Sequence, residues 1–441
     1  MSRLRAFAER HRRRLPYAVL AVAAIAHLQY AAGATSGHTR WDSAEYLANA
    51  RMLAAGAGFR DAAGQPEARR TPGYPLFLAP FLAAGAGVAT IVTVQHLIAI
   101  ALAAAVYALT LSIGGDALAA AVAGLLVAID PGQIYMADVV MSETLMSTAI
   151  FVAVVLLVRL ARRPSFGVAA AAGLAVAASV FVKPAAVYLW IPLLLWVAAA
   201  VVPRRLAVAA AFTVAALALP LLWSWRNEKA AGTFALSSIA GEDLFYFRAA
   251  GAVAMEKSGF TFVPLPFGGE ELFRREFFRL QQRQFTAMAV VLRARAFGAR
   301  AATMTQAQLS AFDGVVARRI LREHPAGTLM ITVNGALHLL FDSAWEYANG
   351  LYGGWTRILV ILLDFALSVA TVLLAVAGFF RLRRRDARAA WLLAAVLLYF
   401  VAVLSGPEQE QWRYRVPIVP LFAVLAGCSA LPRGLEHRVA E

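Results

Sequence analysis

The sequence predicts an all-α, polytopic membrane protein with about ten spanning helices. Apolar residues make up 61% of the 441 residues and charged residues only 15%, whereas a soluble domain is nearer half apolar and a quarter charged. The apolar residues gather in blocks of about 16–28 residues, which as helices are long enough to cross a bilayer core. A helix satisfies every backbone hydrogen bond inside lipid, so each block is expected to be a span.

The predicted spans are separated by short polar stretches. They lie near 16–33, 88–113, 117–136, 142–160, 166–183, 185–202, 206–225, 356–380, 389–405 and 416–431. Arginine-rich stretches precede the first span and follow several others, as RLRRRDAR does after residue 380, which is typical of cytoplasmic loops. Both termini are therefore expected in the cytoplasm. High Arg and Ala usage with little Lys favours a GC-rich bacterium, and hence a bacterial inner membrane.

The net charge of +15 does not indicate nucleic-acid binding, because the basic residues lie where membrane proteins carry them. The single cysteine, Cys428, excludes a disulfide framework and a thiolate metal site within one chain. No HExxH, GxxxxGK[ST], complete GxGxxG or DxD motif occurs. A sugar donor, if one is used, is therefore expected to be a lipid phosphate rather than a nucleotide.

The chain is expected to form one membrane domain, 1–441, with two sizeable loops on the outer face, 34–87 and 226–345. Segment 326–341 is apolar but is interpreted as interfacial, because an eleventh span would place RLRRRDAR outside. Leu309, Phe312, Val316 and Ile320 recur at spacings of 3, 4 and 4. They predict an amphipathic helix on the membrane surface.

The first outer loop carries the strongest local signal, WDSAEYLANARM. Its polar residues Asp42, Glu45, Tyr46 and Asn49 fall at i, i+3, i+4 and i+7, on one face of a predicted helix 43–55. Asp42 could accept a proton from an attacking hydroxyl. Asp42 with Glu45 also resembles a capping box that merely starts the helix, and the two roles are compatible.

Two other outer-face motifs each leave two interpretations open. In RRTPGYP, Arg69 or Arg70 could bind a phosphate, or the motif could be a structural turn. In ADVVMSETL, Ser142 could cap a helix, or Glu143 could face a cavity at the membrane boundary.

Several cationic side chains on the outer face depart from the positive-inside pattern. They are Lys183, Arg226, Arg413 and Arg415. A phosphate or pyrophosphate lipid headgroup would explain them. The alternative is that Arg413 and Arg415 pair with Glu408 and Glu410.

These motifs in this order resemble the C-type (GT-C) polytopic glycosyltransferases, which include aminoarabinose transferases and protein O-mannosyltransferases. The resemblance is carried by WDSAEY, R-x-PGYPLF, SETL, the Lys183–Pro184 junction, RN…G.F..SS and RYRVPIVP. It implies inverting transfer of a sugar from a polyprenyl-phosphate donor to a lipid, glycan or protein acceptor on the outer face. Members act with and without a divalent cation, and the sequence leaves both open.

The resemblance also implies roles for particular residues. Asp42 would activate the acceptor, and Arg70, Lys183, Arg413 and Arg415 would contact the donor phosphate. Taken together with the motifs above, the sequence predicts that Asp42 and Glu143 are catalytic, with Asp42 as general base and Glu143 or Asp138 orienting the acceptor or a metal. The predicted substrate-binding residues are Glu45, Tyr46, Arg70, Tyr74, Asp138, Lys183, Arg226, Arg413 and Arg415. The chain departs from the protein mannosyltransferases because Asp42 is followed by Ser43 rather than by Glu, which leaves the acceptor open.

Two alternatives to an enzyme remain. A transporter or flippase of a lipid-linked or amphiphilic substrate would have ionisable residues and helix breaks near mid-span. A catalytically silent relative could serve in cell-envelope assembly. The polar groups gather mainly at the outer ends of the predicted spans, which favours an enzyme.

Overall fold

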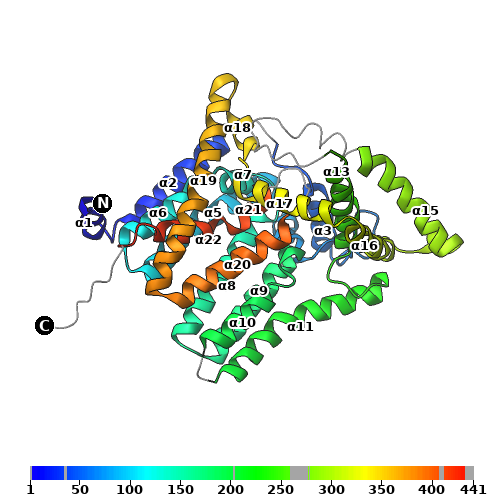
Figure 1. Cartoon of the computed structure of the whole chain (residues 1–441), viewed down its shortest axis with the longest axis horizontal. Coiled ribbons are helices and arrows are strands. Elements are labelled where there is room, and N and C mark those ends of the chain that lie inside the picture. Colours follow the sequence, from blue (N-terminus) through cyan, green and yellow to red (C-terminus); the bar gives the residue numbers. More distant parts are fainter. Residues whose placement is uncertain are drawn as a thin grey trace.

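Helices make up nearly all of the regular structure in the computed structural model, which describes residues 2–33, 37–201, 204–258, 277, 279–406 and 412–432 (Figure 1). Within these residues the sole strand-type pairing is a bridge between Arg60 and Pro66. The all-α prediction is therefore confirmed.

The predicted spans correspond to helices with similar bounds. These are α2 (Leu15–Gly33), α5 (Val88–Gly114), α6 (Ala117–Ala128) with α7 (Pro131–Asp138), α8 (Glu143–Arg162), α9 (Phe166–Val182), α10 (Trp190–Ala200) after the 3-10 turn η1 (Pro184–Ala186), α11 (Arg205–Ala231), α19 (Gly354–Arg385), α20 (Ala387–Leu404) and α22 (Val419–Cys428). Among the described residues, 6 helices are long and apolar enough to cross a membrane, and the α6–α7 pair, bent by 45°, would be a seventh. Helices α9, α10 and α22 are shorter.

The remaining elements belong mainly to the two predicted outer loops. They are α1 (Ser2–Arg10), α3 (Ser43–Ala54), α4 (Gly73–Ala83), α12 (Ile239–Glu242), the π-helical η2 (Asp243–Ala249), α13 (Ala250–Ser258), η3 (Leu280–Phe285), α15 (Thr286–Phe297), η4 (Gly298–Thr303), α16 (Gln306–Glu323), α17 (Pro325–Phe341), α18 (Trp345–Leu351), α21 (Trp412–Arg415) and η5 (Val416–Ile418). The helix predicted at 43–55 is α3. Segment 326–341 forms α17, and its place at the membrane surface stays a prediction.

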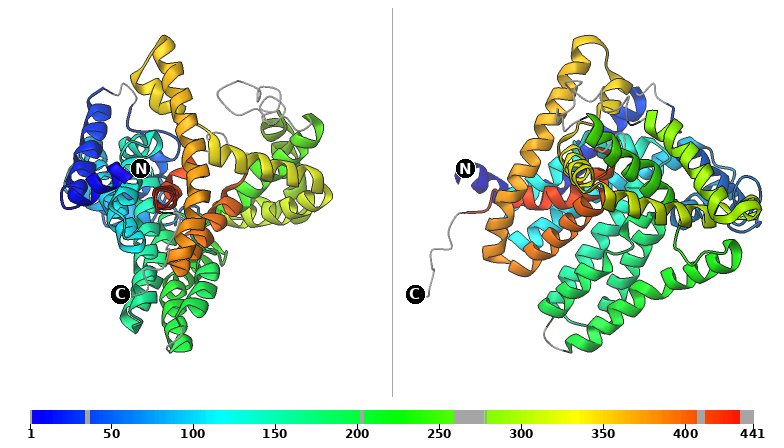
Figure 2. Two further views of the ribbon diagram at one scale, coloured as in Figure 1. Left: turned by 60° about the vertical axis from the view of Figure 1, so that its left-hand side comes forward. Right: turned by 45° about the vertical axis from the view of Figure 1, so that its right-hand side comes forward.

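Helices α12 to α17 form a module with its own apolar cluster, which includes Phe245 and Phe285. Figure 2 shows this module on one side of the span bundle. In α16 the fully buried face is made of small residues such as Ser310 and Gly314, while the predicted apolar stripe is only half-buried. The small face allows α12 to approach closely, since a Cβ on Gly241 would lie 1.9 Å from the carbonyl oxygen of Ser310.

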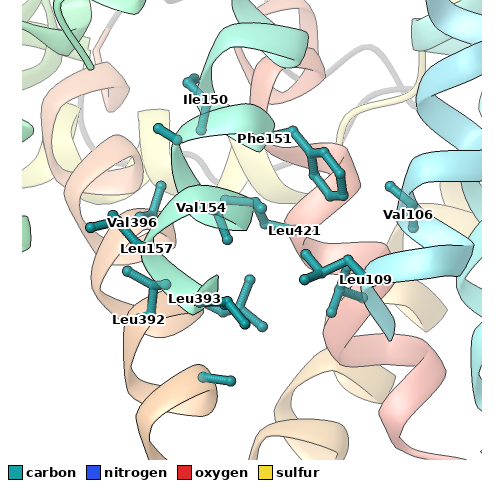
Figure 3. Close-up of a cluster of buried hydrophobic side chains, with 14 of the residues drawn as sticks. Val106, Leu109, Ile150, Phe151, Val154, Leu157, Leu392, Leu393, Val396 and Leu421 are labelled. Carbon is teal, nitrogen blue, oxygen red and sulfur yellow. The ribbon is translucent and has the colours of Figure 1, made fainter. Parts of the chain in front are cut away.

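Part of the main core lies where α5, α8, α20 and α22 pack together (Figure 3). Its side chains include Val106 and Leu109 of α5, Phe151 and Leu157 of α8, Leu393 of α20 and Leu421 of α22. Every residue of α22 is buried. Two glycines allow close backbone contacts of α22. A Cβ on Gly378 of α19 would lie 1.7 Å from the carbonyl oxygen of Leu425 in α22. A Cβ on Gly427 of α22 would lie 2.3 Å from the carbonyl oxygen of Ala119 in α6. Small residues of this kind are typical of membrane helix contacts.

One end of the bundle is rich in arginine. At this end, Arg162 pairs with Asp386 at 3.4 Å, and Arg385 donates to the carbonyl of Gly114 at 2.7 Å. Helix α8 connects this end to the other, because it begins at Glu143 and ends at Arg162. Its 20 residues span about 30 Å, roughly the thickness of a bilayer core.

Gly73 allows the start of α4 to lie in close contact with the end of α9. A Cβ on Gly73 would lie 2.6 Å from the carbonyl carbon and oxygen of Phe181. Replacing Gly73 by Ala should therefore destabilise the protein by about 1–3 kcal/mol through overpacking, measured by thermal unfolding in detergent. Gly167→Ala, where nothing lies within 4 Å, is the control and should not destabilise. Equal stability of the two variants would contradict the close packing.

Candidate active site

The segment before α3 lies beside the segment before α8. The amide of Val140 donates to the carbonyl of His38 at 2.8 Å, and the hydroxyl of Ser43 donates to the carbonyl of Val140 at 2.9 Å. These bonds hold Asp42, which precedes α3, next to the start of α8, where Glu143 is the first residue. The two acidic motifs are thus neighbours in space.

Arg70 joins the polar face of α3 to the start of α4. Its Nη2 donates to Oδ1 of Asp42 at 2.8 Å and its Nε to Oε2 of Glu45 at 2.6 Å. Its guanidinium carbon lies 5.5 Å from the centre of the Tyr46 ring. Asp42 is the N-cap residue of α3, but its side chain makes no capping hydrogen bond. Its carboxylate is therefore paired with Arg70 and does not serve as a helix cap.

Glu67 orients the two arginines and was missed by the sequence analysis. One of its carboxylate oxygens accepts from the backbone N–H groups of Arg69 and Arg70, and the other accepts from the amide of Asn49 at 3.1 Å. Its side chain is buried. The signal was present in PEARR, where a carboxylate stands two and three residues before the arginines.

Glu143 is the second carboxylate of the site and is 0% exposed. The ammonium group of Lys183 donates to its Oε1 at 2.8 Å, and Nε of Arg413 lies 3.6 Å from the same oxygen. Both cations also face the ring of Tyr414, at 4.6 and 4.8 Å from its centre. The other oxygen of Glu143, Oε2, has no hydrogen-bond partner in the described part of the chain. Ser142, the N-cap of α8, makes no capping bond with its side chain.

The positive charges of Arg70, Lys183 and Arg413 all act on the carboxylate of Asp42. Burial is the largest single influence on the pKa of this carboxyl and raises it. The positive charges of Arg70, Arg413 and Lys183 together outweigh burial, so the pKa lies below its ordinary value. Burial raises the pKa of the neighbouring Tyr46 to about 12, so that phenol stays neutral. The site therefore holds an ionised carboxylate among three cations.

Trp41 places the chain immediately before Asp42. Its φ is +46°, a conformation that costs energy for a bulky side chain. The guanidinium of Arg413 lies 5.1 Å from the centre of its ring, a distance typical of a cation–π contact. Trp41 thus links the segment that carries Asp42 to Arg413.

Arg69 connects the site to the α12–α17 module. It pairs with Glu45 at 2.7 Å and with Glu242 of α12 at 3.2 Å. Its carbonyl also accepts a hydrogen bond from the hydroxyl of Ser237. The module is therefore fastened directly over the polar face of α3.

Two further predicted residues lie at the margin of this group. Tyr74 packs edge-on against Tyr46, with ring centres 4.9 Å apart. Asp138 is 1% exposed and faces histidines: its carboxylate lies 3.2 Å from Nε2 of His96 and 3.3 Å from Nδ1 of His38. Asp138 therefore pairs with histidines and not with the arginines and lysine of the site.

Arg226 and Arg415 have partners elsewhere. Arg226 donates to the backbone carbonyls of Glu67 and Phe59, and so holds the turn between α3 and α4. Arg415 is 5% exposed and donates to the carbonyl of Leu340 at 2.9 Å. The alternative partners of Arg413 and Arg415, Glu408 and Glu410, lie outside the described residues.

The described residues contain no group of three or more His, Cys, Asp or Glu side chains placed to hold a metal ion. Asp42 and Glu45 face Arg70, and Glu143 faces Lys183. In this arrangement cations of the protein occupy the places beside the carboxylates, so these residues do not fit a divalent cation.

No protein-family model matches the chain, and no curated protein matches it. A solved structure of the archaeal oligosaccharyltransferase AglB from Archaeoglobus fulgidus, in complex with an inhibitory peptide and a dolichol-phosphate, is similar with a TM-score of 0.51 at 13% sequence identity. The similarity covers 94% of this chain and 50% of AglB. The chain has the GT-C fold. It spans about half the length of the oligosaccharyltransferase, so the activity of that protein does not transfer with the GT-C fold.

Two other solved structures are less similar. The Archaeoglobus fulgidus oligosaccharyltransferase in complex with Zn and sulfate has a TM-score of 0.49 at 12% identity, over 92% of this chain and 48% of that one. ArnT from Cupriavidus metallidurans, bound to undecaprenyl phosphate, has a TM-score of 0.42 at 16% identity, over 88% of this chain and 76% of that one. The assignment of the GT-C fold rests on the first similarity alone.

The burial of Glu143 makes its partner Lys183 important for stability. Lys183→Met removes the nearer of the two cations beside a carboxylate that is 0% exposed, which should cost about 1–3 kcal/mol. The double variant Lys183→Met/Glu143→Gln should recover most of this loss, measured by denaturant or thermal unfolding in detergent. Lys229→Met, at an exposed lysine of α11, is the control. A single variant as stable as this control would contradict the ion pair.

Proposed function

We propose that this protein is a glycosyltransferase that moves a sugar from a polyprenyl-phosphate donor to an acceptor of the cell envelope. The proposal is carried by one observation: Asp42 and Glu143 lie in one site with Arg70, Lys183 and Arg413. A carboxylate can take a proton from an acceptor, and cations can receive the charge of a departing phosphate. The GT-C fold, shared with an oligosaccharyltransferase, agrees with this chemistry.

In the proposed reaction Asp42 is the general base. The acceptor hydroxyl oxygen attacks the anomeric carbon of the sugar while its proton passes to the carboxylate of Asp42. The bond between the anomeric carbon and the phosphate oxygen breaks, and its electron pair leaves with the polyprenyl phosphate. Attack from the side opposite the phosphate inverts the anomeric carbon.

The cations divide into two groups with different roles. Arg70 is shared between two carboxylates, Asp42 and Glu45, so its charge is already compensated and it serves to hold Asp42 ionised. Lys183 and Arg413 both lie beside the carboxylate of Glu143, at 2.8 and 3.6 Å from its Oε1. Ammonium and guanidinium groups bind phosphate oxygens strongly, so these two cations are proposed to bind the donor phosphate.

Glu143 is proposed to orient the acceptor. Its Oε2 is buried and lacks a hydrogen-bond partner among the described residues, and a buried carboxylate oxygen gains from any donor that reaches it. A second hydroxyl of the acceptor is such a donor. This role accommodates a lipid, glycan or protein acceptor, and the acceptor class is left to experiment.

The proposed location of the site follows from the arginine-rich end of the bundle. The arginine-rich end, with Arg162 and Arg385, is proposed to be cytoplasmic by the positive-inside rule. Since α8 connects that end to Glu143, the site is proposed to lie on the outer face of a bacterial inner membrane. Polyprenyl-linked donors would reach it from within the bilayer.

A transporter or flippase is the second candidate, and one observation favours it. The bend between α6 and α7 carries Asp130, which lies close to Arg415 and near the buried Asp364 of α19. Charged groups beside a break in a membrane-spanning helix are typical of transport paths. However, the cavity at Asp130 and Arg415 measures only about 20 Å³, roughly the space for one water molecule. It is far too small for a sugar, so the enzyme is the better supported candidate.

The transferase proposal is tested by following release of free polyprenyl phosphate in proteoliposomes. Purified protein is supplied with a panel of polyprenyl-phosphate sugars and envelope acceptors. Asp42→Asn should lower the rate by about 10²–10⁴-fold because it removes the general base. Asp61→Asn is the matched control, because Asp61 lies in the same loop and its carboxylate accepts hydrogen bonds from the backbone amides of Ala63 and Gln65. This variant should keep its activity.

No turnover of any donor, together with movement of labelled lipid across the bilayer, would reject the transferase and support the transporter. Equal loss of activity in Asp42→Asn and Asp61→Asn would reject the role of Asp42 as base.

The acid limb of the pH–activity profile should report the ionisation of Asp42. Its pKa is lowered by neighbouring cations, so kcat/KM should fall only below the ordinary aspartate pKa of about 3.9. Arg70→Gln removes one of the charges that lower the pKa of Asp42, while burial still raises it. The pKa of Asp42 should therefore rise, and the acid limb should move to higher pH. Arg60→Gln, at an exposed arginine of the same loop, should leave the limb in place. An acid limb at the same pH in Arg70→Gln would contradict the coupling.

A further inference from the structure

An open cavity lies at the arginine-rich end of the bundle, remote from the candidate site. Its volume is about 500 Å³. Its lining residues are Val158, Ala161, Arg162, Trp196, Arg385, Asp386, Ala387, Arg388 and Ala389. Helices α8, α10 and α20, which supply most of the lining, pack against one another and lie close together in Figure 1.

The position of the cavity places it at a membrane boundary. Arg162 is the last residue of α8, and Glu143 is the first. The 20 residues of α8 separate them by about 30 Å, the thickness of a bilayer core. If Glu143 lies at one boundary, the cavity therefore lies at the other, where the headgroups of the opposite leaflet begin.

The cavity has an apolar floor and a basic rim. Val158 and Trp196 form part of the floor and are 6% and 8% exposed. The indole N–H of Trp196 donates to the carbonyl of Arg388 at 2.9 Å, so the floor is fixed to the rim. A tryptophan with its N–H toward the polar side is typical of the membrane–water interface.

The rim carries an excess of positive charge that the protein only partly compensates. Three guanidiniums, of Arg162, Arg385 and Arg388, stand against one carboxylate, of Asp386, which leaves two positive charges. In the described part of the chain each guanidinium bonds through one terminal nitrogen: Nη2 of Arg162, Nη1 of Arg385 and Nη1 of Arg388. Since a guanidinium has five N–H donors, most of them remain for a ligand.

We propose that this cavity binds an anionic membrane phospholipid, with the phosphate on the arginine rim and the acyl chains along the apolar floor. Guanidiniums form strong, charge-assisted hydrogen bonds with phosphate oxygens. Basic pockets between helices at a membrane boundary bind lipid headgroups in this manner. The ligand class differs from the polyprenyl donor of the proposed function, and the site lies at the opposite end of the bundle.

Native mass spectrometry of the full chain, released from nanodiscs, tests the proposal. The nanodiscs contain phosphatidylglycerol and phosphatidylcholine in equal amounts. The wild type should retain phosphatidylglycerol preferentially, and Arg162→Gln/Arg388→Gln should reduce that retention by about tenfold. The matched control is Arg383→Gln/Arg384→Gln, which removes the same charge from the same end of the bundle, at exposed side chains of α19 outside the lining. It should retain the lipid within about twofold of the wild type.

A second variant guards against loss of folding. Arg388→Gln alone changes an exposed side chain with one long hydrogen bond, 3.3 Å to the carbonyl of Ala161, and should still lower retention measurably. Equal loss in the cavity and control variants would overturn the proposal, because it would indicate diffuse attraction to the whole basic end. Retention without preference over phosphatidylcholine would also overturn it. So would tight binding of inorganic phosphate that leaves phosphatidylglycerol retention unchanged. None of these readouts depends on enzyme activity.

Discussion

The buried guanidinium of Arg70 is the interaction on which the rest of the site depends. A charge taken out of water must be compensated, and here Asp42 and Glu45 compensate it from two successive positions of one helix face. The backbone of Arg70 is held in turn by the carboxylate of Glu67. The ion pairs of Arg70 with Asp42 and Glu45 thereby hold the start of α3 against the start of α4. It also keeps Asp42 ionised in a place where burial alone would favour the neutral acid.

The charge of the second carboxylate, Glu143, is compensated in a different way from that of Arg70. Glu143 has two cationic neighbours for one negative charge, whereas Arg70 has two anionic neighbours for one positive charge. In the proposed reaction the donor phosphate binds beside Lys183 and Arg413, and the hydroxyl proton of the acceptor passes to Asp42.

Much of this arrangement could be predicted from the sequence. Apolar blocks located the helices, because a lipid environment leaves few other structures. The i, i+3, i+4, i+7 spacing placed Asp42 and Glu45 on one face, and both contact Arg70. Arg413 and Arg415 could not be separated in this way. They have the same residue type and lie two positions apart, but on the short helix α21 one reaches Glu143 and the other reaches the carbonyl of Leu340. Glu67 was missed because its partners are backbone amides, which no side-chain motif reveals.

The most direct test of the central claim is a cryo-electron microscopy structure of the protein in nanodiscs with polyprenyl phosphate. The account predicts phosphate density within hydrogen-bond distance of Lys183 and Arg413, with Arg70 still paired to Asp42. Phosphate density bound instead by Arg70 with the Asp42 pair broken, or density remote from all three cations, would contradict it.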